Sequence, residues 1–161
     1  MLTSPNPLRF YAELYVERPP SVVWSLFSDP ARWNQWSPIC HESRLLGSDR
    51  LATGSVLQLR LSMSGIPITI QTRLINVNPH SVISWHGRAF GIEAMHTYRL
   101  RAHKTGTLIT NEEVFYGVAF PLNHLIIGWY RMSKLSSSSL DGIRRALELE
   151  IERAPTLDAV R

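Results

Sequence analysis

Apolar and polar residues alternate near the start of the chain, and this pattern predicts a half-buried strand over residues 9–17. The apolar positions of this segment are Phe10, Ala12, Leu14 and Val16. Pro19 and Pro20 end the strand, and the spacing of apolar residues then changes to that of a helix in residues 21–27. A second short helical turn is expected over residues 31–36.

Residues 41–118 carry a pattern of strands separated by turns, and six further strands fit into it. The expected breaks are at residues 47–49, 64–65, 78–79, 87–91 and 104–106. Leu57, Leu59 and Leu61 share one face of their strand, while Gln58 and Arg60 face the other way. Burial on one face only is typical of antiparallel pairing.

After Pro121 the apolar residues recur at the helical period, which predicts one long helix over residues 121–151. Its apolar side is formed by Leu122, Leu125, Ile126, Trp129, Leu135, Leu140, Ile143 and Leu147. No repeat, linker or change of composition divides the chain. We therefore expect a single α+β domain over residues 1–161, with an ordered core over 9–153, of the helix-grip type: a curved antiparallel sheet of about seven strands around a long C-terminal helix.

Composition narrows the class of function. The 161 residues are 44% hydrophobic and 19% charged, as in ordinary globular domains, and the formal net charge is +4. The basic residues are scattered, so no nucleic acid partner is expected. The longest apolar stretch is interrupted by Pro121, Asn123 and His124, and neither a membrane-spanning segment nor a signal peptide is recognised. We expect a cytoplasmic protein without stable membrane insertion, and a homodimer is left open.

The residues that bind cofactors or metals in other proteins show no recognisable spacing here. Cys40 is the single cysteine, and His41 beside it on a strand would point the opposite way. The six histidines show no close ligand spacing, and no phosphate loop or dinucleotide motif is present. We expect no metal and no cofactor. His86 and Arg88 would place cationic groups on one face of a strand, either at a cavity mouth or in solvent.

Two groups of residues carry a resemblance to a known family. The first is Val16-Glu17-Arg18-Pro19-Pro20-Ser21-Val22-Val23-Trp24-Ser25-Leu26-Phe27 followed by Trp33-Asn34-Gln35-Trp36-Ser37-Pro38, and the second is His96-Thr97-Tyr98-Arg99-Leu100, Gly106-Thr107 and Glu112-Glu113-Val114-Phe115-Tyr116-Gly117. Over residues 9–150 the chain resembles the START-like (SRPBCC) superfamily, in its polyketide cyclase/dehydrase and lipid transport branch. The resemblance implies a helix-grip fold with an internal cavity. Proteins of this kind include lipid carriers, cyclases, hormone receptors and chaperone activators, and fold alone does not fix which function applies.

Glu112 and Glu113 are neighbours on a strand, so only one of the two side chains can face the interior. If the preceding turn has an odd number of residues, Glu112 lies opposite Tyr98 and beside His96. We therefore predict that Glu112 faces the cavity and Glu113 faces outward. A carboxylate in an apolar wall would serve as a general base or as an anchor for a ligand hydroxyl. The alternative is an exposed Glu112 paired with arginine, because a register error of one residue exchanges the two glutamates.

The remaining candidates are residues expected to line the interior. Trp33 and Trp36 are three apart on a helical turn and either close one end of a cavity or serve as plain core anchors. Ser136 belongs to a run of four serines in the long helix, whose small side chains would leave room for a ligand. The predicted ligand-binding residues are Trp33, Trp36, Leu59, Leu61, Ile70, Trp85, His96, Tyr98, Glu112, Trp129, Ser136 and Leu140, and the candidate catalytic residues among them are Glu112, His96 and Tyr98.

These features favour binding of a small hydrophobic molecule, such as a lipid, polyketide or isoprenoid-like compound, for transport, storage or sensing. A cyclase or dehydrase type of enzyme acting on a polyketide-like substrate is the first alternative. A protein-interaction module resembling chaperone activators is the second. The sequence does not decide between carrier and catalyst.

Overall fold

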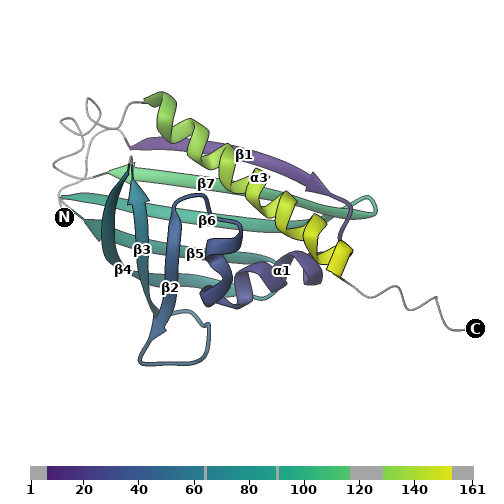
Figure 1. Cartoon of the computed structure of the whole chain (residues 1–161), viewed down its shortest axis with the longest axis horizontal. Coiled ribbons are helices and arrows are strands. Elements are labelled where there is room, and N and C mark those ends of the chain that lie inside the picture. Colours follow the sequence, from purple (N-terminus) through teal and green to yellow (C-terminus); the bar gives the residue numbers. More distant parts are fainter. Residues whose placement is uncertain (1–6, 64, 90, 117–128, 154–161) are drawn as a thin grey trace, which may run out of the picture.

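The computed structural model describes residues 7–63, 65–89, 91–116 and 129–153 (Figure 1). Its elements follow the expected order of a strand, two short helices, six strands and a long helix. They are β1 (Leu8–Val16), α1 (Pro20–Ser28), the 3-10 helix η1 (Pro30–Gln35), β2 (Cys40–Leu46), β3 (Val56–Met63), β4 (Ile66–Asn78), β5 (Val82–Ala89), β6 (Ile92–His103), β7 (Gly106–Tyr116) and α3 (Trp129–Arg153).

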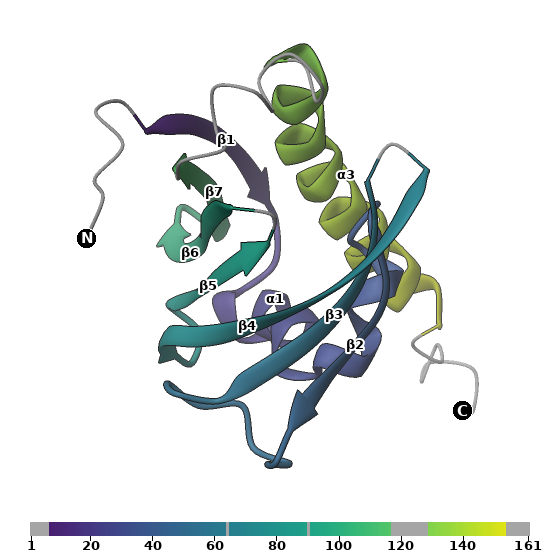
Figure 2. The same cartoon turned by 90° about the vertical axis from the view of Figure 1, so that its left-hand side faces the viewer.

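The seven strands form one antiparallel sheet in the order β1-β7-β6-β5-β4-β3-β2. Figure 2 shows this sheet curving round α1, with α3 lying across the open side between β1 and the β3–β4 hairpin. The predicted fold class is therefore confirmed. The concave face of the sheet, which we call the inner face, holds the apolar core. Residues of every strand on this face form one buried cluster with residues of α1, η1 and α3.

The two short helices follow β1 because a pair of prolines ends the strand and Pro20 suits the first turn of a helix. Helix α1 buries Val23, Trp24, Leu26 and Phe27. Asp29 then caps η1, since its carboxylate accepts a hydrogen bond from the backbone N–H of Ala31 at 3.1 Å. The expected helical elements over residues 21–27 and 31–36 are thus present, the second as a 3-10 helix.

Helix α3 packs mainly on β1 and β7 and touches α1 near its C-terminal end (Figure 1). Leu140, Ile143 and Leu147 recur at helical spacing and are almost fully buried, as their predicted place on the apolar side requires. The predicted start of this helix at residue 121 lies outside the described residues. Trp129 begins α3, but its side chain also lies outside the described part of the chain.

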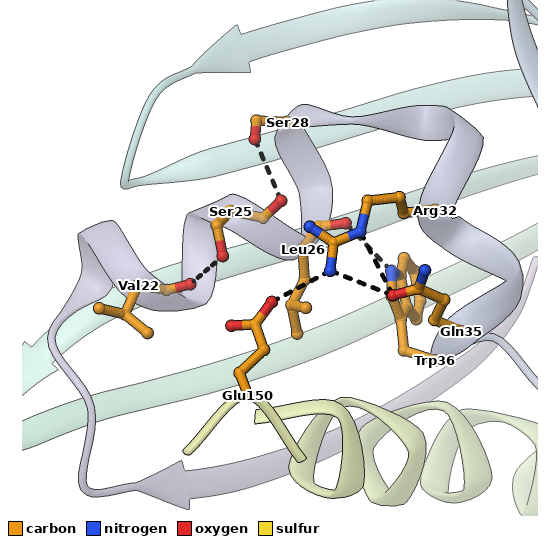
Figure 3. Close-up of polar contacts among 8 residues, drawn as sticks. All are labelled: Val22, Ser25, Leu26, Ser28, Arg32, Gln35, Trp36 and Glu150. Atoms are coloured by element: carbon orange, nitrogen blue, oxygen red, sulfur yellow. Dashed lines mark hydrogen bonds and ion pairs between the residues drawn. The ribbon is translucent and has the colours of Figure 1, made fainter. Parts of the chain in front are cut away.

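Gly142 lets α3 approach η1 more closely than any other residue would. A Cβ atom at this position would lie 1.9 Å from the backbone oxygen of Trp36, the residue that follows η1. Nearby, Arg32 of η1 forms an ion pair with Glu150 of α3 at 3.2 Å and also donates to the side-chain oxygen of Gln35 (Figure 3). The C-terminal half of α3 is therefore held in one position against the segment that follows β1.

One expected break is shorter than predicted. The break over residues 87–91 falls between Ala89 and Ile92, because β5 continues through Gly87 to Ala89. Gly87 lies opposite Thr72, and a Cβ atom there would be 2.7 Å from the Thr72 methyl carbon. The glycine thus serves close packing within the sheet. In the part of the chain that the structure describes, no helix is long and apolar enough to cross a membrane.

Candidate functional site

Among the residues that the structure describes, the inner face carries one buried carboxylate, Glu113 of β7, which is only 5% exposed. Its Oε1 atom accepts a hydrogen bond from the Ser136 hydroxyl of α3 at 2.9 Å and another from the Asn111 side-chain amide at 3.0 Å. Hydrogen bonds to a charged group each contribute about 1.5 to 3 kcal/mol, and they offset the cost of burying the carboxylate. Glu113 therefore links the sheet to the long helix inside the core.

The prediction that Glu112 faces the interior is wrong. Glu112 points to the outer face of the sheet, where its Oε1 atom lies 2.9 Å from Arg9 of β1. The cause is the turn between β6 and β7: His103 pairs with Gly106, so the turn has two residues, and the resulting register places Glu113 opposite His96 and Glu112 opposite Thr97. An even turn exchanges the two faces relative to the odd turn that was assumed.

His96 lies on the inner face directly across from Glu113. Its Nδ1 atom is 3.8 Å from Glu113 Oε2, and its ring stacks on Trp85 with centroids 5.3 Å apart and an interplanar angle of 6°. The His96 side chain keeps a relative exposure of 25%, which is high for a group on the concave side of the sheet. His96 is thus the polar group of this cluster that a molecule approaching from solvent can reach.

Tyr98 lies two residues further along β6 and is 3% exposed. Burial raises the pKa of its phenol, the negative charge of Glu113 raises that pKa further, and a hydrogen bond with the Ser139 hydroxyl acts in the opposite direction. The Tyr98 ring packs against Phe27 at 5.0 Å and Trp85 at 5.9 Å. Both His96 and Tyr98 therefore face the interior as predicted.

Trp33 and Trp36 act as anchors that fix η1 to the core. Their indole N–H groups donate to the backbone oxygens of Phe27 and Leu26, each at 3.1 Å, and both side chains are almost fully buried. The Trp33 ring also lies 5.0 Å from that of Trp85, and Tyr98 of β6 contacts both Phe27 and Trp85, so the two short helices, β5 and β6 together build an aromatic wall. We use this name for Phe27, Trp33, Trp36, Trp85 and Tyr98.

The sequence did not single out Asn111, which is fully buried on the inner face of β7 opposite Tyr98. Its amide nitrogen donates to Glu113, but its Oδ1 atom has no hydrogen-bond partner within the described part of the chain. Thr72 Oγ1 on β4 is unpaired in the same sense. A buried acceptor without a donor costs about 1 to 3 kcal/mol. The only sequence signal was that Asn111 shares the face of Ile109 and Glu113 on its strand.

The remaining apolar candidates lie in or against the core, except one whose side chain is not described. Leu59, Leu61 and Leu140 are buried in the core, and Ile70 packs against it while half-buried. Ser136 is buried and joins the polar cluster through Glu113, so its predicted place between helix and sheet holds. The Trp129 side chain is outside the described residues.

The other chemical groups that the sequence raised lie away from this cluster. His86 Nε2 on the outer face is 3.1 Å from Glu93 Oε2. Cys40 is buried, which raises the pKa of its thiol, whereas His41 is exposed, so the two do not form a pair. A surface pocket of about 430 Å³ lies where β1 ends beside α3, and none of the predicted site residues lines it. Among the described residues, no cluster of His, Cys, Asp and Glu side chains suits a metal ion.

Comparisons with known proteins agree with the fold. The family described as polyketide cyclase/dehydrase and lipid transport matches residues 7–148. The ZhuI aromatase/cyclase from Streptomyces sp. R1128 superposes with a TM-score of 0.77 at 16% identity, covering 93% of this chain and 99% of that one. A major latex-like protein from Panax ginseng superposes with a TM-score of 0.69 at 13% identity, covering 87% and 97%. No curated protein sequence matches the chain.

Proposed function

Because the chain belongs to the polyketide cyclase/dehydrase and lipid transport family, we propose that it binds a small, mainly apolar molecule against the inner face of its sheet, for transport, storage or sensing. The observation that carries this proposal is Glu113, a carboxylate buried between β7 and α3 among aromatic and aliphatic side chains. A carboxylate inside a core is costly to maintain, and its hydrogen bonds only offset that cost. A ligand that needs a polar anchor gives it a role.

The aromatic wall supplies the apolar side of the proposed site. Trp85 lies at its centre, in ring contact with Trp33, His96 and Tyr98. Flat aromatic or polycyclic molecules gain dispersion energy and lose apolar hydration when they stack on such rings. The partial exposure of His96 supports access to the polar cluster from solvent. Binding sites of this composition, mostly apolar with a few convergent polar groups, suit lipophilic ligands.

One observation favours an enzyme as the second candidate. Glu113 Oε2 and His96 Nδ1 lie 3.8 Å apart, and a ligand that draws them slightly closer would complete a carboxylate-imidazole pair. In that arrangement His96 would remove a proton next to a ligand carbonyl, and Glu113 would hold the imidazole ring and stabilise its positive charge. One of the structural neighbours is an aromatase/cyclase, which is consistent with this chemistry on the same fold.

The binding proposal is tested by ligand-induced stabilisation. Nile red and a panel of neutral polycyclic molecules should raise the melting temperature by mass action, and native mass spectrometry should detect a one-to-one complex. Trp85→Ala should abolish the effect, because the centre of the aromatic wall is lost. Leu149→Ala, which truncates an exposed residue on the far side of α3, is the matched control and should bind normally. If no member of the panel shifts melting, the binding proposal fails.

The enzyme candidate needs a separate readout. In deuterium oxide, a bicyclic ketone such as 2-tetralone should exchange its acidic benzylic protons faster in the presence of the protein. His96→Ala and Glu113→Gln should both remove that acceleration. Glu112→Gln is the control, since its carboxylate lies on the outer face. Ligand binding without any exchange would leave the carrier as the function.

A further inference from the structure

The polar cluster between the inner face and α3 leaves one buried hydrogen-bond acceptor, Asn111 Oδ1, without a donor among the described residues. We use the name polar cluster for His96, Tyr98, Asn111, Glu113, Ser136 and Ser139. The Ser136 hydroxyl and the Asn111 amide nitrogen both donate to the same oxygen of Glu113. The Tyr98 hydroxyl is engaged with Ser139, whose own proton goes to the backbone oxygen of Leu135. Each of these hydroxyl and amide groups already donates to an acceptor of the protein, while the Asn111 Oδ1 atom has no donor among the residues that the structure describes.

The orientation of the Asn111 amide is fixed by its neighbour. If the amide were turned over, its oxygen would face the Glu113 carboxylate oxygen now at 3.0 Å, and two acceptors would be in contact. The nitrogen must therefore point to Glu113, and the oxygen must point away from it. This amide oxygen is a fixed acceptor in a residue with no exposed surface.

The charge of the cluster also points to one class of ligand. In the described part of the chain, Glu113 forms an ion pair with one side chain that can carry a positive charge, and that side chain is His96. A ligand carboxylate placed here would meet the Glu113 carboxylate and the Asn111 oxygen, and both would repel it. A hydroxyl or amino group would instead supply the missing donor.

We propose that Asn111 and Glu113 together select ligands that present a neutral hydroxyl or an amino group to the inner face, and that they reject fatty acids and other carboxylates. This inference rests on the proposed binding function and deepens it by naming the ligand class. Asn111 Oδ1 accepts the ligand proton, and the carboxylate of Glu113 excludes anions.

The test compares molecules that share one apolar body. 2-Naphthol carries a donor, 2-methoxynaphthalene has the same oxygen without the proton, and 2-naphthoate carries a negative charge. Displacement of Nile red by each compound gives the three affinities. A hydrogen bond that satisfies a buried acceptor should make naphthol bind roughly tenfold more tightly than the methyl ether. Naphthoate should bind more weakly than either of them.

Variants assign the preference to its residue. Asn111→Leu should reduce the ratio of naphthol to methyl ether affinity to about one, and Ser136→Ala should retain it, because that change removes only a donor. Thr97→Val is the matched control: Thr97 is also buried and hydrogen-bonded, to Ser84, but on the outer face of the same sheet. If Asn111→Leu does not fold, the inference is still tested by the relative affinities of the three compounds for the unaltered protein and for Ser136→Ala.

The outcomes separate the two proposals. If neither Nile red nor the uncharged naphthalenes bind, the proposed function fails. If they bind but naphthol and its methyl ether bind equally well, an ordered water satisfies Asn111 and the inference is overturned while the function stands. A preference for naphthoate, or a naphthol preference that persists in Asn111→Leu, overturns it as well.

Discussion

Ser136 of α3 donates a hydrogen bond of 2.9 Å to Glu113 of β7, and this contact joins the long helix to the sheet inside the core. Both residues are at least 95% buried, so water does not compete for the bond. A polar contact in this position fixes the rotation of the helix about its axis, because only one face of α3 presents a hydroxyl to the carboxylate. The same contact makes the stability of the fold sensitive to the Glu113 side chain.

Replacing Glu113 by leucine should destabilise the protein by about 2 to 5 kcal/mol, because the Ser136 hydroxyl and the Asn111 amide would be buried without an acceptor. Urea unfolding measures the change. Glu112→Leu is the control and should cost less than about 1 kcal/mol, since the ion pair of Glu112 with Arg9 is solvent-exposed. Equal losses in the two variants would contradict the assignment of the inner face.

Gly142→Ala should destabilise the fold although alanine is the better helix former. The new methyl group would collide with the backbone oxygen of Trp36, and the displacement of α3 should cost about 1 to 3 kcal/mol or more. Ser138→Ala in the same helix lacks such a collision and should gain a few tenths of a kcal/mol, so it serves as the control. Thermal unfolding followed by circular dichroism distinguishes the two. An unchanged melting temperature for Gly142→Ala would show that α3 does not press against this backbone.

The Arg32–Glu150 ion pair should contribute little to stability. Its two side chains are 41% and 33% exposed, and a double-mutant cycle should give a coupling free energy of about 0.2 to 1 kcal/mol. The coupling should decrease as salt is added, because the charges are screened. A coupling free energy that is larger than this and insensitive to salt would contradict the prediction. The packing of η1 on α3 would then depend more on the ion pair than on the close contact at Gly142.

The free energy of unfolding should fall as pH rises above about 10. Burial raises the pKa of Tyr98, so the unfolded chain loses this proton at a lower pH than the folded chain does. Above the ordinary tyrosine pKa the unfolded state then binds fewer protons, and stability decreases with pH. Tyr98→Phe should flatten this dependence without abolishing it, since the pKa values of Tyr11 and Tyr116 are also raised. Urea unfolding between about pH 8 and pH 11 measures the slope, and an unchanged slope in Tyr98→Phe would contradict the prediction.

The period of apolar residues was sufficient to predict the elements, because each has one face toward a common core. Phe10, Leu14 and Val16 are buried on β1, and Leu140, Ile143 and Leu147 on α3, as their spacing indicated. Such patterns record which side of an element faces inward. They do not record which residues of two strands lie opposite each other.

The choice between Glu112 and Glu113 depended on that register, and the register depended on one turn. Lys104 adopts a positive φ of 51°, a conformation that the sequence gives little reason to expect of lysine, and it allows a turn of two residues. The partnership of Glu113 with Ser136 and the unpaired oxygen of Asn111 arise only when the helix meets the sheet. Contacts of this kind are set by tertiary packing, for which one sequence carries no local signal.

The pairing of β1 with β7 has a consequence for how the protein folds. Leu8 lies opposite Phe115 and Val16 opposite Thr107, so β1 can pair only after the five intervening strands and β7 have been synthesised. Such distant pairing raises the contact order and slows folding, because a long loop must close before the contacts stabilise it. Until β1 has paired with β7, one edge of β7 is unpaired, and α3 lacks one of the two strands on which it packs. The nascent chain is therefore exposed to aggregation at this edge for as long as β1 is not in place.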